Sequence, residues 1–251
     1  MKKLISVIFP TRKRVPHLTN LLNAIIETTN DISRIEVLLR VDTDDEQTLS
    51  FLTLPNNAQK HTVKYKKVLD LIVIVGDRGN GYIDFNDWYT ALAYTSTGEW
   101  VWYLNDDITL HPSAKGWDSR IEKIPGDKIL IPDVGSYGWP FVPRKFFDVI
   151  KGVWIGPFDI WWWDAGQSLG CIQRIDVPQK HQIISDDLTK EKHTSHQIKN
   201  SSGHTYFWFT KKDPNGLKKS FIKILKQGLK DGKPPTDLIT QHNIKKWVAV
   251  K

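Results

Sequence analysis

The clearest chemical signal in the sequence is the acidic turn Asn105-Asp106-Asp107, which follows the hydrophobic run Glu99–Leu104. Carboxylates are hard oxygen ligands, and Mg²⁺ or Mn²⁺ usually binds one or two of them together with substrate phosphates. Solvated acidic turns are also common, so the motif alone is compatible with a simple surface turn. Its meaning depends on where the fold places it.

Three further polar clusters each follow a predicted β-strand. The strands are short apolar runs at residues 4–9, 35–41 and 68–75, and Glu99–Leu104 is the fourth. In a doubly wound sheet, ligands bind beyond the carboxyl ends of the strands. We therefore expect one edge of the sheet to carry the functional site. The clusters at that edge would be Thr11 to Arg14, Asp42 to Asp45, Asp77 to Tyr82 and Asn105 to Asp107.

Helical patterns separate these strands. Pro16 suits the first turn of a helix, and apolar residues recur at helical spacing from Leu18 to Ile26. A second helix is predicted to begin at an Asp84 cap and to end by Gly98. Strands that alternate with helices predict a doubly wound α/β sheet.

The second half of the chain has a less regular pattern. It predicts strands at 128–132 and 172–177, helices at 144–150 and 160–169, and a polar loop at 186–203. Residues 217–229 form a basic amphipathic helix. Such a helix either packs on the domain or makes a peripheral contact with a membrane, and the pattern favours packing slightly.

Composition narrows the function classes. The 251 residues are 40% hydrophobic, which is enough for a real core. The single cysteine, Cys171, excludes an internal disulfide framework, and we expect a cytoplasmic protein. The run at residues 4–9 is too short for a signal peptide, and no apolar stretch reaches the roughly 20 residues that span a bilayer. The net charge of +7 favours anionic partners.

The order of the motifs resembles the inverting, GT-A-fold glycosyltransferases of the family-2 type. SVIFPTRKRVPHLTNLLNAI resembles their first strand, turn and helix, LLRVDTDD their second strand with its base-contacting aspartate, and YLNDDITLHP their Asp-x-Asp motif. The segment VGDRGNGYIDFNDWYTALAYTSTGEWVWYLNDD, with GWD at Gly116 to Asp118, is most similar to a bacterial and viral subgroup. The resemblance covers residues 4–118 well and 140–182 more loosely.

This resemblance implies a Rossmann-type nucleotide-binding sheet followed by an acceptor-side C-terminal portion. Residues 1–210 would form one domain, with a nucleotide-sugar half at 1–118 and an acceptor half at 119–210. Residues 211–251 would be a basic amphipathic extension. The implied partners are a nucleotide-sugar donor, with a UDP-sugar favoured, and a glycan or lipid-linked acceptor. The implied cofactor is Mn²⁺ or Mg²⁺, and the implied activity is a hexosyltransferase.

Carried over position by position, the resemblance also assigns site residues. Asp107 stands at the metal-binding position of Asp-x-Asp, and His181 follows a late strand where a histidine often completes the metal shell. Asn105 stands where the family has an aspartate, and Asp106 is open as a further metal ligand. The residues implied to bind the nucleotide sugar are Pro10, Thr11, Arg12, Asp42, Arg78, Gly79, Tyr82, Asn86, Asn105 and Asp106.

The resemblance leaves two candidates for the catalytic base. An inverting transferase needs a carboxylate to deprotonate the acceptor hydroxyl. Counting back from Leu169-Gly170 places Asp159 at the base position, although Phe158 occupies the position of the preceding acid. Asp164 is the rival. The three tryptophans before Asp164 form either a wall on which a sugar stacks or part of the core.

Two other functions remain open from the sequence. Nucleotidyl transfer also uses an α/β sheet, a metal and carboxylates, but it favours a glycine-rich first turn, which Thr11 to Arg14 lacks. A catalytically degenerate module that binds a nucleotide sugar or nucleic acid is the second. The basic C-terminal segment favours nucleic acid, whereas acidic clusters at the strand ends would repel it, so nucleic acid is not the expected partner.

Overall fold

The computed structural model confirms the α/β prediction. It describes residues 3–54, 60–78, 84–132, 139–150, 158–182 and 217–232. Eight strands form one sheet in the order β3-β4-β2-β1-β5-β8-β7-β9, and β6 and β10 form a separate pair. The strands are β1 Ile5–Thr11, β2 Ile35–Asp42, β3 Lys60–Tyr65, β4 Leu69–Gly76, β5 Trp100–Tyr103, β6 Ile108–Leu110, β7 Ile129–Pro132, β8 Phe141–Pro143, β9 Ile172–Ile175 and β10 Gln179–His181.

The central strands β4, β2, β1 and β5 are all parallel. Their faces are covered on both sides, so they are nearly continuous apolar runs, as buried parallel strands usually are. The chain passes from β1 to β2 on one side and later returns to place β5 on the other side of β1. The strand order therefore reverses between β1 and β5, which is the point at which open α/β sheets bind ligands.

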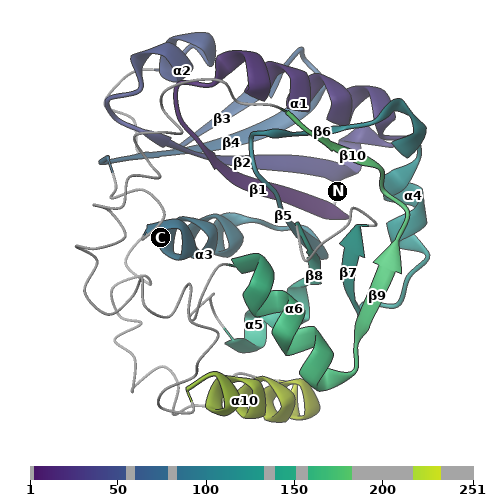
Figure 1. Ribbon diagram of the computed structural model, residues 1–251. Helices are drawn as coiled ribbons and strands as arrows, with labels where there is room; N and C mark the ends of the chain where they lie inside the picture. Colours follow the sequence, from purple (N-terminus) through teal and green to yellow (C-terminus); the bar gives the residue numbers. More distant parts are fainter. Residues whose placement is uncertain are drawn as a thin grey trace.

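Helices cover both faces of the sheet (Figure 1). Helices α1 and α2 lie on one face, and α3, α5, α6 and α10 lie on the other. The short helix α4 follows the β6 segment. The helices are α1 Val15–Thr28, α2 Glu46–Phe51, α3 Phe85–Thr95, α4 Trp117–Glu122, α5 Arg144–Ile150, α6 Phe158–Leu169 and α10 Leu217–Asp231.

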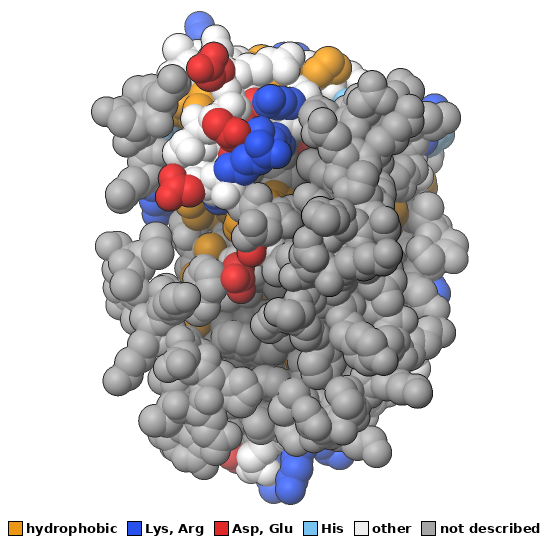
Figure 2. Space-filling model, turned by 60° about the vertical axis from the view of Figure 1, so that its left-hand side comes forward, with side chains coloured by type: hydrophobic (Ala, Val, Ile, Leu, Met, Phe, Trp, Pro, Cys, Tyr) orange, Lys and Arg blue, Asp and Glu red, His pale blue; other side chains and the backbone are white. Residues whose placement is uncertain are grey.

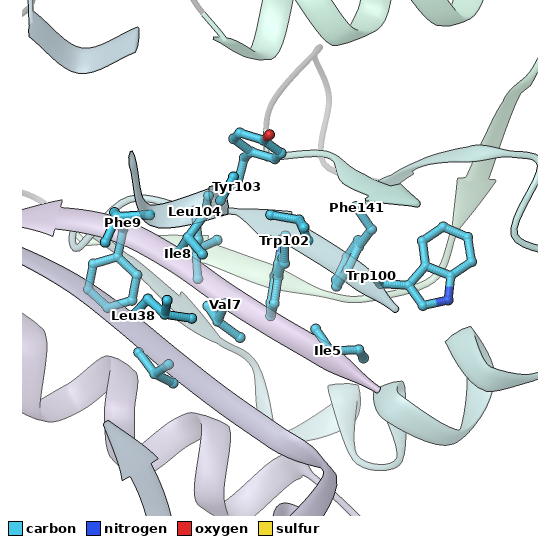
Figure 3. Packing of buried hydrophobic residues seen from close by; sticks show 14 of the residues in the cluster. Ile5, Val7, Ile8, Phe9, Leu38, Trp100, Trp102, Tyr103, Leu104 and Phe141 are labelled. Atoms are coloured by element: carbon cyan, nitrogen blue, oxygen red, sulfur yellow. The ribbon is translucent and has the colours of Figure 1, made fainter. Parts of the chain in front are cut away.

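The core lies between β1, β5 and the helices packed on them. Ile5, Val7, Ile8 and Phe9 of β1 are fully buried, and Trp102 of β5 stacks on Phe141 of β8 with 4.3 Å between ring centroids (Figure 3). Burying side chains of this size supplies most of the folding free energy. The sheet centre is thus a rigid base for the loops at its carboxyl edge.

Several elements differ from the sequence expectation. The edge strand β3 was not predicted, because its sequence KHTVKY has only two apolar residues, Val63 and Tyr65, and none of its residues is buried. The pair β6 and β10 was also missed, because three-residue strands carry almost no pattern. The second helix stops at Thr95 and not at Gly98, and Asp84 occupies its N-cap without making a side-chain capping hydrogen bond.

The basic helix α10 packs against α5 and α6, where Leu225 is fully buried. Lys223, Lys226 and Lys230 lie on its exposed side. Within the described residues, no helix combines the length and apolarity that a membrane span requires. The predicted membrane contact through 217–229 would therefore have to use the lysine side of the helix.

Candidate functional site

The turns that follow β1 and β5 meet at the point where the strand order reverses. The Thr11 hydroxyl donates to Asp106 Oδ2 at 2.9 Å, and Arg14 Nη1 donates to Asp106 Oδ1 at 2.9 Å. The Asp106 carboxylate is nearly buried, with 5% of the residue exposed. It therefore joins two turns that the sequence places more than ninety residues apart.

The first residue of the acidic turn is held from another side. Asn105 Oδ1 accepts a hydrogen bond from the hydroxyl of Tyr89, a buried residue of α3, at 2.6 Å. The same hydroxyl lies 2.6 Å from the Leu104 carbonyl oxygen. This amide thus connects the turn to α3.

The third residue, Asp107, is partly exposed and lies beside β10. In the β6–β10 pair, His181 stands opposite Ile108, the residue after Asp107. The Gln182 backbone N–H donates to the Asp107 carbonyl oxygen at 2.6 Å. The backbone therefore brings positions 107 and 181 together, although they are far apart in sequence. The His181 side chain lies outside the described part.

The end of β2 carries a cluster of ion pairs. Arg12 Nη1 lies 2.9 Å from Asp42 Oδ2, and the Arg12 guanidinium also contacts both carboxylate oxygens of Asp44. The pKa of Asp44 is lowered because Arg12 donates hydrogen bonds to its carboxylate. Burial raises the pKa of Asp42, against the opposing effects of Arg40 and Arg12.

This cluster of ion pairs lies at the edge of the sheet where the parallel strands end. The parallel strands end on the left of Figure 1, and Figure 2 turns that side forward. Basic and acidic side chains alternate there in the upper part of the view. Arg78, which follows β4, has its Nη1 3.9 Å from Asp44 Oδ2. The edge therefore carries charges of both signs and not a single acidic field.

The turn after β1 has an unusual backbone. Lys13 adopts a left-handed conformation with φ 51°, which non-glycine residues seldom do. Its N–H donates to Asp45 Oδ2 at 2.7 Å, while Asp45 Oδ1 caps α2 by accepting from the Thr48 N–H at 3.1 Å. The contact compensates for the strained backbone and fixes the turn that carries Arg12. Such strain is often found at functional sites.

The remaining predicted nucleotide-binding positions are placed as follows. Pro10 lies near the end of β1, and Asn86 lies in the first turn of α3, with its side chain outside the described part. Gly79 and Tyr82 fall outside the described residues altogether. The structure thus brings Pro10, Thr11, Arg12, Asp42, Arg78 and the acidic turn to one edge, while their individual contacts with a donor remain predictions.

Both candidates for the catalytic base lie on α6. Asp159 is in its first turn, with its side chain outside the described part, and Asp164 is partly exposed in its middle. Five residues apart on a helix, the two positions differ by about 140° around the axis. The two positions therefore lie on different sides of the helix axis, and the choice between them stays open.

The three tryptophans of α6 have separate environments. Trp161 and Trp162 are 1% and 0% exposed, and the Trp162 ring packs 5.8 Å from that of Tyr103. Trp163 is partly exposed and lies 5.2 Å beneath the Arg174 guanidinium. Two of the three are therefore core residues, and Trp163 alone could contact a sugar.

The sequence did not identify three residues that build this site. Arg14 was noted only as part of a basic turn, Asp45 only as part of an acidic cluster, and Arg40 not at all. Arg40 had a usable signal, because it is the one charged residue within the otherwise apolar run Val37–Val41. The roles of Arg14 and Asp45 depend on contacts between distant turns, which no local pattern shows.

The GWD motif has a different place. The Asp118 carboxylate accepts the backbone N–H groups of Asn30 and Asp31 at 2.9 and 3.0 Å, and Gly116 adopts φ 77°. These contacts fix the connection between α1 and β2, at the amino edge of the sheet. The motif therefore supports the fold and lies away from the candidate site.

The chemistry of the acidic turn fits a divalent metal that arrives with its substrate. Among the described residues, no group of three His, Cys, Asp or Glu side chains is arranged to hold a metal ion. Magnesium and manganese sites often use one or two carboxylates and complete their shell with phosphates and water. Asp107 supplies one such carboxylate, and the backbone of β10 places position 181 beside it.

Comparison with solved structures supports the assignment of the fold. TarS of S. aureus, solved with UDP-GlcNAc, matches 98% of this chain and 79% of its own, with a TM-score of 0.59 and 12% identity. The mannosyltransferase PcManGT of Pyrobaculum calidifontis, solved with GDP-Man and Mn²⁺, matches 100% of this chain and 81% of its own, with a TM-score of 0.53 and 11% identity. This chain has the GT-A-like glycosyltransferase fold.

The likeness is one of fold and not of close sequence relationship. No protein-family profile and no curated protein matches the chain. The longer TarS structure matches 94% of this chain at a TM-score of 0.55 and 13% identity, and the chain spans 50% of its length. The GT-A-like fold is therefore shared, while activity has to be argued from the residues.

Proposed function

We propose that this protein is a metal-dependent glycosyltransferase that moves a sugar from a nucleotide-sugar donor to a hydroxyl acceptor, with inversion at the anomeric carbon. The observation that carries the proposal is the meeting of the β1 and β5 turns through Asp106, which presents Asp107 beside β10 at the reversal point of the sheet. Both TarS and PcManGT were solved with nucleotide sugars.

In this proposal the carboxyl edge binds the donor. Asp42 accepts a hydrogen bond from the base, Arg12 and Arg78 lie near the nucleotide, and Asn105 faces the ribose. Asp107 and His181 would hold Mn²⁺ or Mg²⁺ against the diphosphate, where the ion neutralises charge on the leaving group. A UDP-sugar is the favoured donor, and a hexose the favoured sugar.

The chemical step is a single displacement. Asp159 or Asp164 takes the proton of the acceptor hydroxyl, whose oxygen bonds to the anomeric carbon as the bond from that carbon to the diphosphate breaks. The acceptor is a glycan or a lipid-linked sugar. We place the protein in the cytoplasm, with a peripheral membrane contact through the lysine side of α10 as the alternative to simple packing of that helix. We assign 1–210 to one domain and 211–251 to an extension.

The test is donor binding with and without metal. UDP-, GDP-, CMP- and dTDP-sugars are screened by thermal shift with Mn²⁺ or EDTA, and hydrolysis or transfer is followed by mass spectrometry. We expect one donor class to stabilise the protein only with Mn²⁺. Asp107→Ala should abolish this metal-dependent stabilisation and the turnover of the donor.

The matched control is Asp127→Ala. Asp127 is exposed in the turn before β7, at the opposite edge of the sheet, so the substitution removes the same charge away from the site. It should leave donor binding unchanged. Full metal-dependent activity in Asp107→Ala would exclude the metal assignment. No stabilisation by any nucleotide would favour a non-catalytic module. Consumption of added pyrophosphate, with formation of a nucleoside triphosphate and a sugar 1-phosphate from the nucleotide sugar, would indicate nucleotidyl transfer.

A further inference from the structure

Arg40 is a buried cation at the carboxyl end of β2 that contacts three separate segments. Its Nη2 donates to the Asp77 carbonyl oxygen at 2.6 Å, and its Nη1 donates to the Val41 carbonyl oxygen. Nη1 also lies 3.3 Å from Asp42 Oδ1, and the guanidinium carbon is 5.5 Å from the centroid of the Trp88 ring on α3. One side chain thus links β2, the end of β4 and α3.

Burying this guanidinium is costly. Only 8% of Arg40 is exposed, and desolvation lowers its pKa. Room for it depends on Gly76, because a Cβ on that residue would lie 2.9 Å from Arg40 Nη2. Replacing a buried ion pair by apolar side chains is often neutral or stabilising, so stability alone does not explain a charge at this position.

The arrangement around Asp42 suggests a functional reason. Its two carboxylate oxygens are held by different arginines, Oδ2 by Arg12 at 2.9 Å and Oδ1 by Arg40 at 3.3 Å. The plane of the carboxylate is therefore fixed. Through the Asp77 carbonyl, Arg40 also fixes the residue immediately before Arg78. Two of the predicted donor-binding residues, Asp42 and Arg78, thus depend on the same buried side chain.

We propose that Arg40 is a positioning residue of the donor site: it contacts no donor atom, but it orients Asp42 and anchors the segment that carries Arg78. The inference rests on the proposed function, since it assigns Arg40 a role in donor binding. Arg40 lies within the motif LLRVDTDD, but the predicted contacts gave it no role.

The role also affects protonation. Donor binding needs Asp42 as a carboxylate if that group accepts a hydrogen bond from the base. Burial raises the pKa of Asp42, and Arg40 and Arg12 both lower it. Loss of Arg40 should therefore raise the Asp42 pKa further. As the pH is lowered, the variant should then lose donor binding at a higher pH than the wild type does. The other charged groups around the pair come from the adjoining turns and are Arg12, Asp44, Asp77 and Asp84.

The chain offers a matched control in Arg144. This buried arginine donates to the carbonyl oxygens of Ala93 and Ser96 at 2.8 and 2.7 Å and lies 5.7 Å from the Phe147 ring. Burial lowers its pKa as well. It resembles Arg40 in burial and bonding, but it holds the end of α3 at the amino edge of the sheet. A purely structural effect of losing a buried arginine should therefore appear in both variants.

The experiment compares Arg40→Met, Arg40→Lys and Arg144→Met in the full chain. Dissociation constants for UDP and GDP with Mn²⁺ are measured by calorimetry across pH, and melting temperatures are recorded in parallel. For the nucleotide that the wild type binds, Arg40→Met should weaken binding about tenfold or more, the value of one hydrogen bond to a charged group. The pH below which this variant loses nucleotide binding should be higher than that of the wild type.

The other variants separate positioning from stability. Arg40→Lys keeps the charge but not the fork, so its binding should be intermediate, and the pH below which it loses binding should be close to that of the wild type. Arg144→Met should melt at a lower temperature with unchanged affinity and pH profile. If Arg40→Met does not fold, Arg40→Lys against Arg144→Met still decides the question.

Two results would overturn the inference. One is an Arg40 variant with the affinity and pH profile of the wild type. The other is equal weakening in Arg144→Met, which would show that any buried arginine has this effect. A wild-type protein that binds neither nucleotide is a different outcome, because it contradicts the proposed function itself.

Discussion

Alanine substitution of the adjacent acids Asp106 and Asp107 should affect different properties, stability for Asp106 and metal-dependent donor binding for Asp107. Asp106 is nearly buried, and its carboxylate accepts hydrogen bonds from Thr11 and Arg14, whose side chain is 11% exposed. Asp107 is partly exposed beside β10. We therefore predict that Asp106→Ala mainly destabilises the fold, whereas Asp107→Ala mainly removes metal-dependent donor binding.

The size of the first effect follows from the two contacts. A hydrogen bond to a charged group contributes about 1.5–3 kcal/mol. Removing both should lower the free energy of unfolding by about 3–5 kcal/mol, since contributions within one network are not additive. For a chain of this size each kcal/mol moves the melting temperature by about 2–4 °C, so Asp106→Ala should melt about 10 °C lower. Asp106→Asn keeps an acceptor for Thr11 and should fall between.

Urea unfolding followed by circular dichroism measures the free energies, and calorimetry measures binding of the nucleotide with Mn²⁺ below the melting range. Asp107→Ala should lose less stability than Asp106→Ala, because the Asp107 side chain is partly exposed. The reasoning is refuted if Asp106→Ala is as stable as the wild type, or if Asp107→Ala loses the greater stability.

Two further predictions concern the packing beside β1 and the ion pair between Arg12 and Asp44. Gly98→Ala should lower the free energy of unfolding by about 1–3 kcal/mol, because the new Cβ would lie 2.6 Å from Ser6 N and Oγ; an unchanged urea midpoint would contradict the close packing. Asp44→Asn should lose stability relative to the wild type at neutral pH. Because Arg12 lowers the pKa of Asp44, the stabilisation is present above the unfolded-state pKa and is lost as the pH falls through the folded-state pKa. The difference in urea midpoint between variant and wild type should therefore shrink as the pH falls below the unfolded-state pKa of Asp44, and a constant difference would exclude this pair as its source.

The N-terminal part of the fold was predictable because its elements are long and strongly patterned. The run Ile35–Asp42 is buried along its whole length, and Val15–Thr28 shows one apolar face behind Pro16. The type and the order of such elements can be predicted from the sequence. The α/β fold and the location of four polar turns at one edge followed from them.

What the sequence could not show are the contacts among those turns. Nothing local to Asp106 indicates that it pairs with Arg14, because the two belong to different strand ends that meet only in the folded sheet. The same holds for β10, whose pairing with β6 brings His181 towards the acidic turn. Partition of an acidic cluster into structural and ligand-facing members is therefore a tertiary property.

That partition explains how an apparently acidic edge can serve an anionic donor. Arg14 neutralises Asp106, Arg12 contacts both Asp42 and Asp44, and Asn105 brings no charge where an aspartate was expected. These pairs reduce the net negative charge of the edge, and Asp107 lies beside β10. For the proposed diphosphate donor, Asp107 is a carboxylate suited to a shared metal ion, and the departure at Asn105 reduces repulsion and does not by itself argue against donor binding.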